Sequence, residues 1–92
     1  MIVCFSELCS KEVIDVHSGF RLGYVYDTEF EDKEGRLVSL VTPGRSKLFG
    51  LLGREEDYVL PMTAIVRIGS DIILADLQEN CQRRKRAKRS WW

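Results

Sequence analysis

Histidine is the residue type in this chain that most often serves as a general acid or base, and the chain has one, His17. It lies beside Ser18 in a short polar stretch ending at Gly19, a composition typical of a hairpin turn. A general base needs a positioned partner and substrate, and no motif around this position supplies an acid for it. We therefore expect His17 to be a solvated turn residue with no catalytic role.

Three cysteines, Cys4, Cys9 and Cys81, could in principle bind a metal or form disulfides. Their number is odd and no CxxC spacing occurs, whereas structural zinc needs closely spaced pairs of ligands. Neither a metal site nor a disulfide framework is predicted. Free thiols fit a reducing compartment, so we expect a cytoplasmic location.

Phosphate binding by a glycine-rich loop is also not indicated. Gly44, Gly50 and Gly53 share one stretch, but no GxxxxGK[ST] or GxGxxG order leads from it into a helix. Acidic residues such as Glu29, Glu31 and Asp32 are most simply explained as the solvated face of a strand. We expect no enzyme activity, no cofactor and no small-molecule substrate.

One loop carries an apolar group that could contact a partner. Residues 45–54 place four large apolar side chains between glycines and cations: Leu48, Phe49, Leu51 and Leu52. If exposed, they form the kind of patch that marks a partner site or a homodimer interface. The alternative is that they close one end of a small barrel, which needs side chains to fill it. The sequence leaves both open.

The C-terminal stretch is strongly basic and ends in two tryptophans. Its candidate contact residues are Arg83, Arg84, Lys85, Arg86, Lys88, Arg89, Trp91 and Trp92. Such a segment can bind an anionic membrane surface, since cations and indoles both favour the interface. It can equally bind RNA through phosphates and stacked bases. A third alternative is a solvated tail, disordered or helical, either free in solution or folded back on the acidic body.

Charge divides the chain into two parts. Residues 1–78 hold eight Lys and Arg against 13 Asp and Glu, a net charge of −5, while residues 79–92 hold six against one, a net charge of +5. We therefore expect a domain over residues 1–77 and a tail over residues 78–92. No apolar run approaches the ~20 residues of a membrane-spanning helix, and the opening residues lack a basic leader region. Membrane contact, if any, would be peripheral.

Short strand patterns separated by turns dominate the domain and predict an all-β fold. We expect strands at residues 12–16, 21–31 and 37–41, joined as a meander, with aromatics of residues 21–31 packed on one face. Further strands are expected at residues 58–60, 65–68 and 72–75, with one helical turn at residues 61–64. A second short turn, capped by Ser6, is expected at the N-terminus. This makes about six strands and one or two helical turns.

Several segments together resemble a known family. The segments are Ser6-Glu7-Leu8, Lys11-Glu12-Val13-Ile14-Asp15, Gly19-Phe20-Arg21-Leu22-Gly23, Gly35-Arg36-Leu37, Phe49-Gly50-Leu51, Tyr58-Val59-Leu60-Pro61 and Ile65-Val66-Arg67-Ile68-Gly69. In order and spacing they are similar to a PRC-barrel domain, and more narrowly to the YlmC/YmxH sporulation group of stand-alone PRC-barrel proteins. Met62 departs from this group, which often has tryptophan there.

The resemblance implies a small six-stranded barrel that works as a non-enzymatic adaptor. It carries no catalytic residues to transfer. The function expected is therefore binding of protein partners, associated with sporulation, with a homodimer among the options. The alternative is a nucleic-acid or ribosome-associated factor that uses the basic tail.

Overall fold

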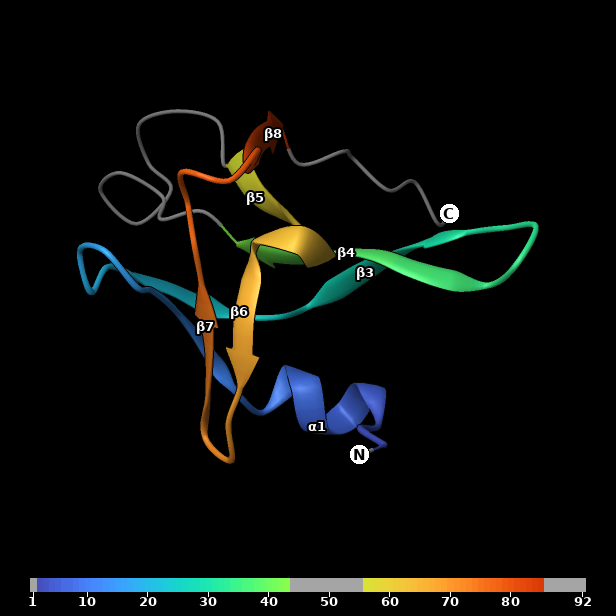
Figure 1. Ribbon diagram of the computed structural model, residues 1–92, viewed down its shortest axis with the longest axis horizontal. Helices are drawn as coiled ribbons and strands as arrows, with labels where there is room; N and C mark the ends of the chain where they lie inside the picture. The colour runs from blue at the N-terminus through green and yellow to red at the C-terminus, as the bar shows by residue number, and fades with distance from the viewer. Residues whose placement is uncertain (1, 44–55, 86–92) are drawn as a thin grey trace, which may run out of the picture.

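The computed structural model describes residues 2–43 and 56–85, and most of this part of the chain is extended strand. The elements that it defines are α1 Phe5–Cys9, β1 Glu12–Asp15, β2 Arg21–Tyr24, β3 Asp27–Glu31, β4 Arg36–Pro43, β5 Glu56–Pro61, η2 Met62–Ala64, β6 Ile65–Ile68, β7 Ile72–Ala75 and β8 Gln82–Lys85. Figure 1 shows the β6–β7 hairpin crossing the direction of the β3–β4 hairpin, with α1 below β3 and β4 and beside the lower part of the β6–β7 hairpin.

The described strands form two sheets of four. Sheet A has the order β2-β1-β7-β6, in which β1 and β7 are parallel and the other pairs are antiparallel. Sheet B has the order β3-β4-β5-β8 and is antiparallel throughout. The predicted all-β class is confirmed. Within the described residues it takes the form of two open, packed sheets, with β2 and β3 as separate strands and β8 added to the expected set.

One hydrophobic core lies between the two sheets. It gathers buried side chains from α1, from both sheets and from the β2–β3 connection: Leu8, Val13, Leu22, Val25, Leu40, Leu60, Ile73 and Ala75. Met62 packs against this cluster as well. Burying apolar surface from both sheets in one cluster holds the sheets together.

The predicted continuous strand over residues 21–31 is wrong, and so is the meander built on it. The chain leaves sheet A after Tyr24 and enters sheet B at Asp27. In the pairing of β1 with β2, Val13 lies opposite Gly23 and Ile14 opposite Arg21, so Leu22 is an extra residue that forms a β-bulge. Gly23 has a φ of +95°, a backbone conformation that favours glycine. Leu22 and Val25 therefore both reach the core, although an odd spacing in a regular strand would place them on opposite faces.

The extra residue also changes which side chains face the core, so the predicted packing of the aromatics is wrong. Tyr24, Tyr26 and Phe30 are 53%, 41% and 62% exposed, whereas Val25 is 1% exposed. A one-residue slip exchanges the two faces of a strand, so the side chains expected inside lie outside. The aromatics are consequently available on the surface.

Several local predictions are confirmed. The hairpin of β6 and β7 pairs Ile65 with Ala75 and Ile68 with Ile73. The turn after Pro61 is the 3-10 turn η2. The N-terminal turn also exists as α1, but its cap is Cys4 rather than Ser6, and the Cys4 N–H donates to Glu7 Oε1 at 3.3 Å.

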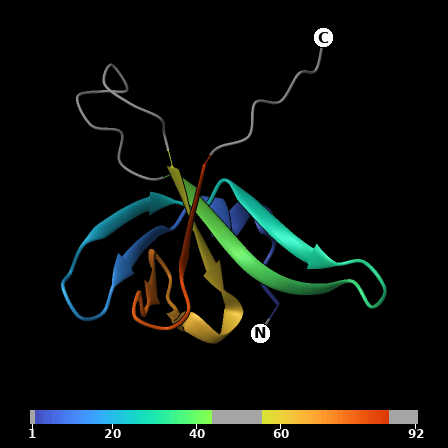
Figure 2. The same cartoon turned by 90° about the horizontal axis from the view of Figure 1, so that it is seen from above.

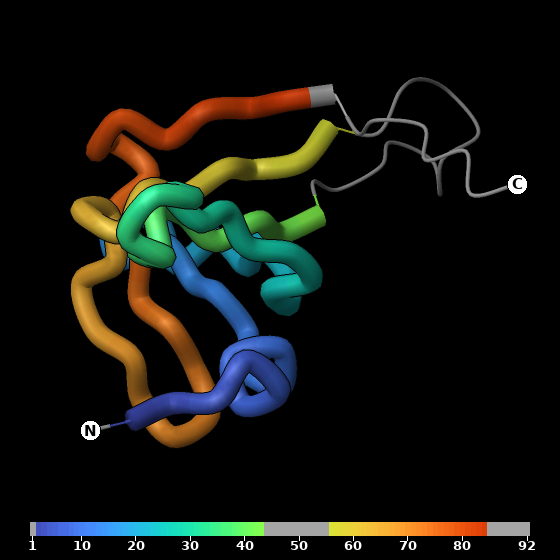
Figure 3. The backbone as a smooth tube through the Cα atoms, turned by 90° about the vertical axis from the view of Figure 1, so that its right-hand side faces the viewer, coloured from blue at the N-terminus to red at the C-terminus, as the bar shows by residue number. Residues whose placement is uncertain are grey.

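Part of the stretch assigned to a basic tail belongs to sheet B. Residues 82–85 form β8, antiparallel to β5, with Tyr58 opposite Arg83 and Asp57 opposite Arg84. Leu77 and Cys81, in the connection that leads to β8, pack against the core. Figure 3 shows β8, β5 and β4 lying side by side. Among the described residues, no helix is long and apolar enough to cross a membrane.

Candidate interaction surfaces

The outer face of sheet A carries apolar side chains, of which Ile72 is exposed and Ile14 and Leu74 are half-buried. In β1 and β7, alternate residues such as Val13 and Ile73 are buried, so their neighbours Ile14, Ile72 and Leu74 point away from the core. The parallel register places Ile14 beside Leu74.

Two further side chains extend this face on its outer strands. Tyr24 of β2 is paired with Glu12, and Arg67 of β6 is paired with Leu74. Residues opposite one another in neighbouring strands lie on the same face. We call these six residues, Glu12, Ile14, Tyr24, Arg67, Ile72 and Leu74, the sheet A surface.

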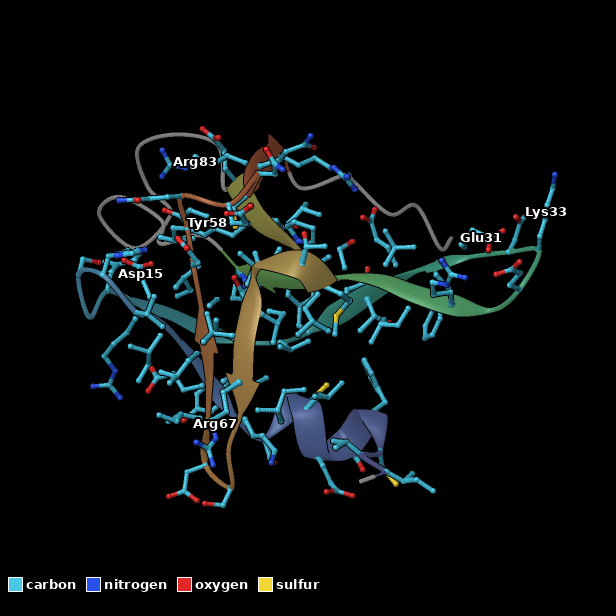
Figure 4. All side chains as sticks on the ribbon, in the orientation of Figure 1. Asp15, Glu31, Lys33, Tyr58, Arg67 and Arg83 are labelled. Atoms are coloured by element: carbon cyan, nitrogen blue, oxygen red, sulfur yellow. The ribbon has the colours of Figure 1, made fainter. Side chains whose placement is uncertain are left out.

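Charges border the sheet A surface. Arg21 Nε and Nη2 both donate to Glu12 Oε1, at 3.0 and 2.5 Å, so the charges of these two side chains balance each other. Arg67 is exposed and makes no ion pair with any described residue. Figure 4 shows it at the lower end of the β6–β7 hairpin. A pocket of about 480 Å³ there is lined by Arg67, Gly69, Ser70, Asp71, Ile72 and Leu74.

A second surface lies on sheet B, where Arg84 of β8 reaches Glu29 of β3. Arg84 Nη1 lies 2.6 Å from Glu29 Oε2, and Ser39 Oγ donates to Glu29 Oε1 at 2.5 Å. These two donors, the arginine first, hold the pKa of Glu29 below its usual value, although burial opposes them. The Tyr26 hydroxyl donates a hydrogen bond to Asp57 Oδ2, and Asp57 is the residue opposite Arg84.

Arg83 contacts the neighbouring residue of β5. Its guanidinium carbon lies 5.1 Å from the centroid of the Tyr58 ring, within the range of a cation–π contact, and Nη2 donates to the Tyr58 hydroxyl at 3.0 Å. Tyr58 in turn meets Phe20 edge-on, with 6.4 Å between ring centroids. Figure 4 shows Arg83 and Tyr58 close together at the top of the molecule. We call the contacts of Arg83 and Arg84 with Tyr58 and Glu29 the β8 clasp.

His17 lies in the turn between β1 and β2, as predicted, and its side chain is 49% exposed. It is not merely solvated, because its Nε2 lies 3.0 Å from Asp76 Oδ1. These residues are 59 positions apart, so no local pattern could have indicated the pair. The contact fastens the turn to the segment that follows β7.

Asp15 organises the same turn from inside. Its carboxylate accepts hydrogen bonds from Ser18 Oγ at 2.7 Å, Ser18 N at 2.9 Å and Leu77 N at 3.1 Å. The Ser18 hydroxyl, assisted by these backbone N–H groups and opposed by burial, lowers the pKa of Asp15 to about 2. The Asp15 site is therefore a charged structural anchor between β1 and the β7–β8 connection.

The remaining predicted site residues divide by position. Leu48, Phe49, Leu51 and Leu52, and the tail residues Arg86, Lys88, Arg89, Trp91 and Trp92, lie outside the described residues. Lys85 is the last residue of β8. Arg83 and Arg84 lie on sheet B rather than in a detached tail.

The cysteines Cys4, Cys9 and Cys81 are free thiols. Burial, the largest cause, and nearby carboxylates raise the pKa of Cys81, whose thiol donates to the Asp76 carbonyl at 3.4 Å. Within residues 2–43 and 56–85, no three His, Cys, Asp or Glu side chains gather in a way that could hold a metal ion.

The sheet A surface was missed in the sequence, although a signal for it was present. Residues 72–75 are an uninterrupted apolar run, and Val13 and Ile14 are adjacent apolar residues. A strand with only one covered face usually alternates apolar and polar residues, so a continuous apolar run indicates that both faces of the strand are apolar. In the described residues, one of these faces packs on the core and the other belongs to the sheet A surface.

Comparison with known proteins identifies the family. The family model described as "PRC-barrel domain" matches residues 3–79. The chain is 35% identical over 78 residues to "Probable sporulation protein YlmC" of Bacillus subtilis (strain 168), covering 85% of this chain and 96% of that protein.

Two further relatives carry no functional name. The chain is 37% identical over 76 residues to "Uncharacterized protein YmxH" of Bacillus subtilis (strain 168), covering 80% of this chain and 88% of that protein. It is 36% identical over 67 residues to an uncharacterized protein of Clostridium acetobutylicum, covering 73% and 76%. With two packed β-sheets and a domain model that spans most of its length, this chain belongs to the PRC-barrel family, in the group that contains YlmC and YmxH.

Proposed function

We propose that this PRC-barrel protein is a non-enzymatic adaptor that binds a protein partner. The observation that carries the proposal is the sheet A surface, where Tyr24 of β2 and Ile72 of β7 are exposed and Arg67 of β6 lies at the opposite edge from Tyr24. An exposed aromatic and aliphatic group with an arginine at its border has the composition of a protein-binding hot spot. The partner that fits it presents apolar side chains and a carboxylate opposite Arg67.

The proposed process is sporulation. Support comes from the name of the relative YlmC, which matches over 96% of its own length. We also propose a cytoplasmic location, because three free thiols fit a reducing compartment. A second copy of the chain is one partner that the test below distinguishes.

The alternative, a nucleic-acid or ribosome-associated factor, has less support. Two of the cations that would contact phosphates, Arg83 and Arg84, already contact Tyr58 and Glu29. Counterion release on RNA scales with the number of cations that meet phosphates, so their engagement lowers the expected RNA affinity. The acidic balance of residues 1–78 also disfavours the domain body as a phosphate-binding surface.

Affinity capture from the native host tests the adaptor proposal. The double variant Tyr24→Ser/Ile72→Ser should lose the partner that the unaltered chain retains, because it removes the exposed apolar groups and leaves the core untouched. Analytical ultracentrifugation of the same two proteins shows whether the lost partner is a second copy.

The matched control is Phe30→Ser on β3 of sheet B, which removes a somewhat more exposed aromatic from the other sheet. This variant should retain the partner. Equal capture by all three proteins would exclude the sheet A surface as the binding site. A host in which deletion of the gene leaves the yield of heat-resistant spores unchanged would contradict the sporulation assignment.

A further inference from the structure

The edge of sheet B next to β5 is covered by a strand that lies beyond the family domain. The family match ends at residue 79, whereas β8 spans Gln82–Lys85. Within the matched and described residues, β5 is thus the last strand of sheet B. A β-strand edge presents a row of backbone donors and acceptors that an extended segment can pair with. In this chain β8 fills that edge.

Pairing of β8 with β5 is reinforced by side chains of specific chemistry. Arg84 meets a carboxylate of β3 at 2.6 Å, and Arg83 lies over an aromatic ring of β5 while donating to its hydroxyl at 3.0 Å. The Arg83 contact depends on the flat guanidinium, which lies over the ring while one nitrogen donates to the hydroxyl, and lysine has no such plane. The Arg84 contact is a single charge-assisted hydrogen bond from Nη1 to the carboxylate. The edge therefore favours arginine over lysine through the ring contact, and β8 supplies two adjacent arginines to it.

The receiving groups are held in place by residues outside β8. Ser39 of β4 donates to the same Glu29 carboxylate that Arg84 reaches. The hydroxyl of Tyr26 donates to Asp57, and Phe20 packs edge-on against the ring of Tyr58. Groups positioned before a ligand arrives lose little entropy when it binds. The site is thus built by residues that do not belong to β8.

We propose that the β5 edge is a strand-docking site for an extended protein segment carrying two adjacent arginines, and that β8 is its built-in occupant. A partner segment of this chemistry would add to the sheet by backbone pairing and compete with β8 for Glu29 and Tyr58. This site is separate from the sheet A surface, so either one can fail without affecting the other.

In the unaltered protein, β8 competes with any added peptide for the β5 edge. A tethered strand acts at an effective concentration in the millimolar range, so a free peptide competes poorly with an intact β8. Release of β8 should therefore expose a site that is otherwise concealed. Arg84→Glu is the releasing variant, because it places a third carboxylate next to Glu29 and Asp57.

Fluorescence anisotropy with a labelled peptide of residues 80–88 measures docking in trans to the full-length protein. The Arg84→Glu chain should bind this peptide at least about tenfold more tightly than the unaltered chain, since the tethered competitor is weakened. Hydrogen exchange of those amides of residues 56–59 that face β8 should be faster in that variant, while the amides bonded to β4 should be unchanged.

Three controls separate recognition from simple charge attraction. Arg36→Glu makes the same charge change on the exposed β3–β4 hairpin, where Arg36 pairs with Glu34 at 2.8 Å, and should bind like the unaltered chain. Adding Glu29→Gln to Arg84→Glu should abolish the gain in affinity. A peptide with lysine at both arginine positions should bind the Arg84→Glu chain about tenfold more weakly than the arginine peptide.

Each outcome decides the proposal. Equal peptide affinity of the unaltered and Arg84→Glu chains would overturn it, as would equal binding of the lysine and arginine peptides. Unchanged exchange in β5 of the Arg84→Glu chain would show that the β8 clasp does not hold the strand, which also contradicts it. Loss of partner capture at the sheet A surface leaves all of these measurements unaffected.

Discussion

Asp15 shows how one carboxylate can join two distant segments. It ends β1, accepts two hydrogen bonds from Ser18 in the following turn, and accepts another from the backbone of Leu77, 62 residues away. A buried charge costs free energy unless donors surround it, and here the donors are in place. The side chain was missed as an anchor because half of its partners lie at the far end of the domain.

We predict that Asp15→Asn lowers the free energy of unfolding by about 1–3 kcal/mol, because an amide replaces one acceptor with a donor that faces the Ser18 donors. Urea denaturation at neutral pH measures the change. Asp32→Asn, at an exposed position in the β3–β4 turn, is the control and should change stability by less than about 0.5 kcal/mol. Equal losses in the two variants would exclude the anchor role.

The pKa of Asp15 also predicts an acid dependence. Its folded pKa of about 2 lies below the ordinary 3.8, so the folded state favours the charged form. The stabilisation is complete above about pH 4 and is lost as pH falls towards 2. Denaturation profiles from pH 2 to 5 should fall less steeply for Asp15→Asn than for the unaltered chain. Parallel profiles would contradict this assignment.

At the scale of elements, Gly23 decides where one strand becomes two. Its φ of +95° and the extra residue Leu22 turn the chain from sheet A into sheet B. The alternation over residues 21–31 indicated one strand because period-two patterns do not reveal a bulge inside them. An isolated glycine inside a strand pattern was the available signal of a break.

We predict that Gly23→Ala destabilises the fold by about 1–2 kcal/mol, since a side chain at positive φ is strained. A Cβ there would meet Pro43 Cγ at 3.6 Å, an ordinary contact, so the cost arises from the backbone. The control is Gly35→Asn in the β3–β4 turn, with a φ of +68° and open space, because asparagine tolerates this conformation. Urea midpoints that are lowered equally by both substitutions would argue against a special role for Gly23.

Elements with local signals were predictable, and those made by distant pairing were not. The β6–β7 hairpin and the turn after Pro61 follow from apolar runs, a glycine and a proline close together in the chain. The parallel pairing of β1 with β7 and the pairing of β8 with β5 join segments that are far apart in the chain, and no local pattern in either segment indicates its partner. Of the candidate sites, only Arg83, Arg84 and Lys85 fall within the described residues.

At the scale of the whole molecule, both sheets depend on one core. Leu60 of sheet B and Ile73 of sheet A are fully buried in the same cluster. Elements that share a core usually unfold together. Figure 2 shows the tip of the β3–β4 hairpin extending away from the other strands. Phe30, on the β3 strand of this hairpin, is exposed.

We predict that Leu60→Ala destabilises both sheets together, by about 2–5 kcal/mol, and that Ile73→Val does so by about 0.5–1.5 kcal/mol. Hydrogen exchange of β6, β7, β4 and β5 amides should accelerate by similar factors in each variant. Val66→Ala, at an exposed position of β6, should leave exchange unchanged. Faster exchange confined to one sheet would show that the sheets are independent.

The amino-acid sequence by itself determined the all-β class, most of the strand segments and the local turns, because each depends on patterns a few residues long. It also determined the family resemblance, because that depends on the order and spacing of such short segments along the chain. Only the tertiary structure decided that β2 and β3 belong to different sheets, that apolar Ile72 and Leu74 face outward, and that the first arginines of the basic segment pair with sheet B. The physical reason is that strand pairing and burial depend on contacts between residues far apart in the chain, and these are set by the folded core rather than by neighbouring residues.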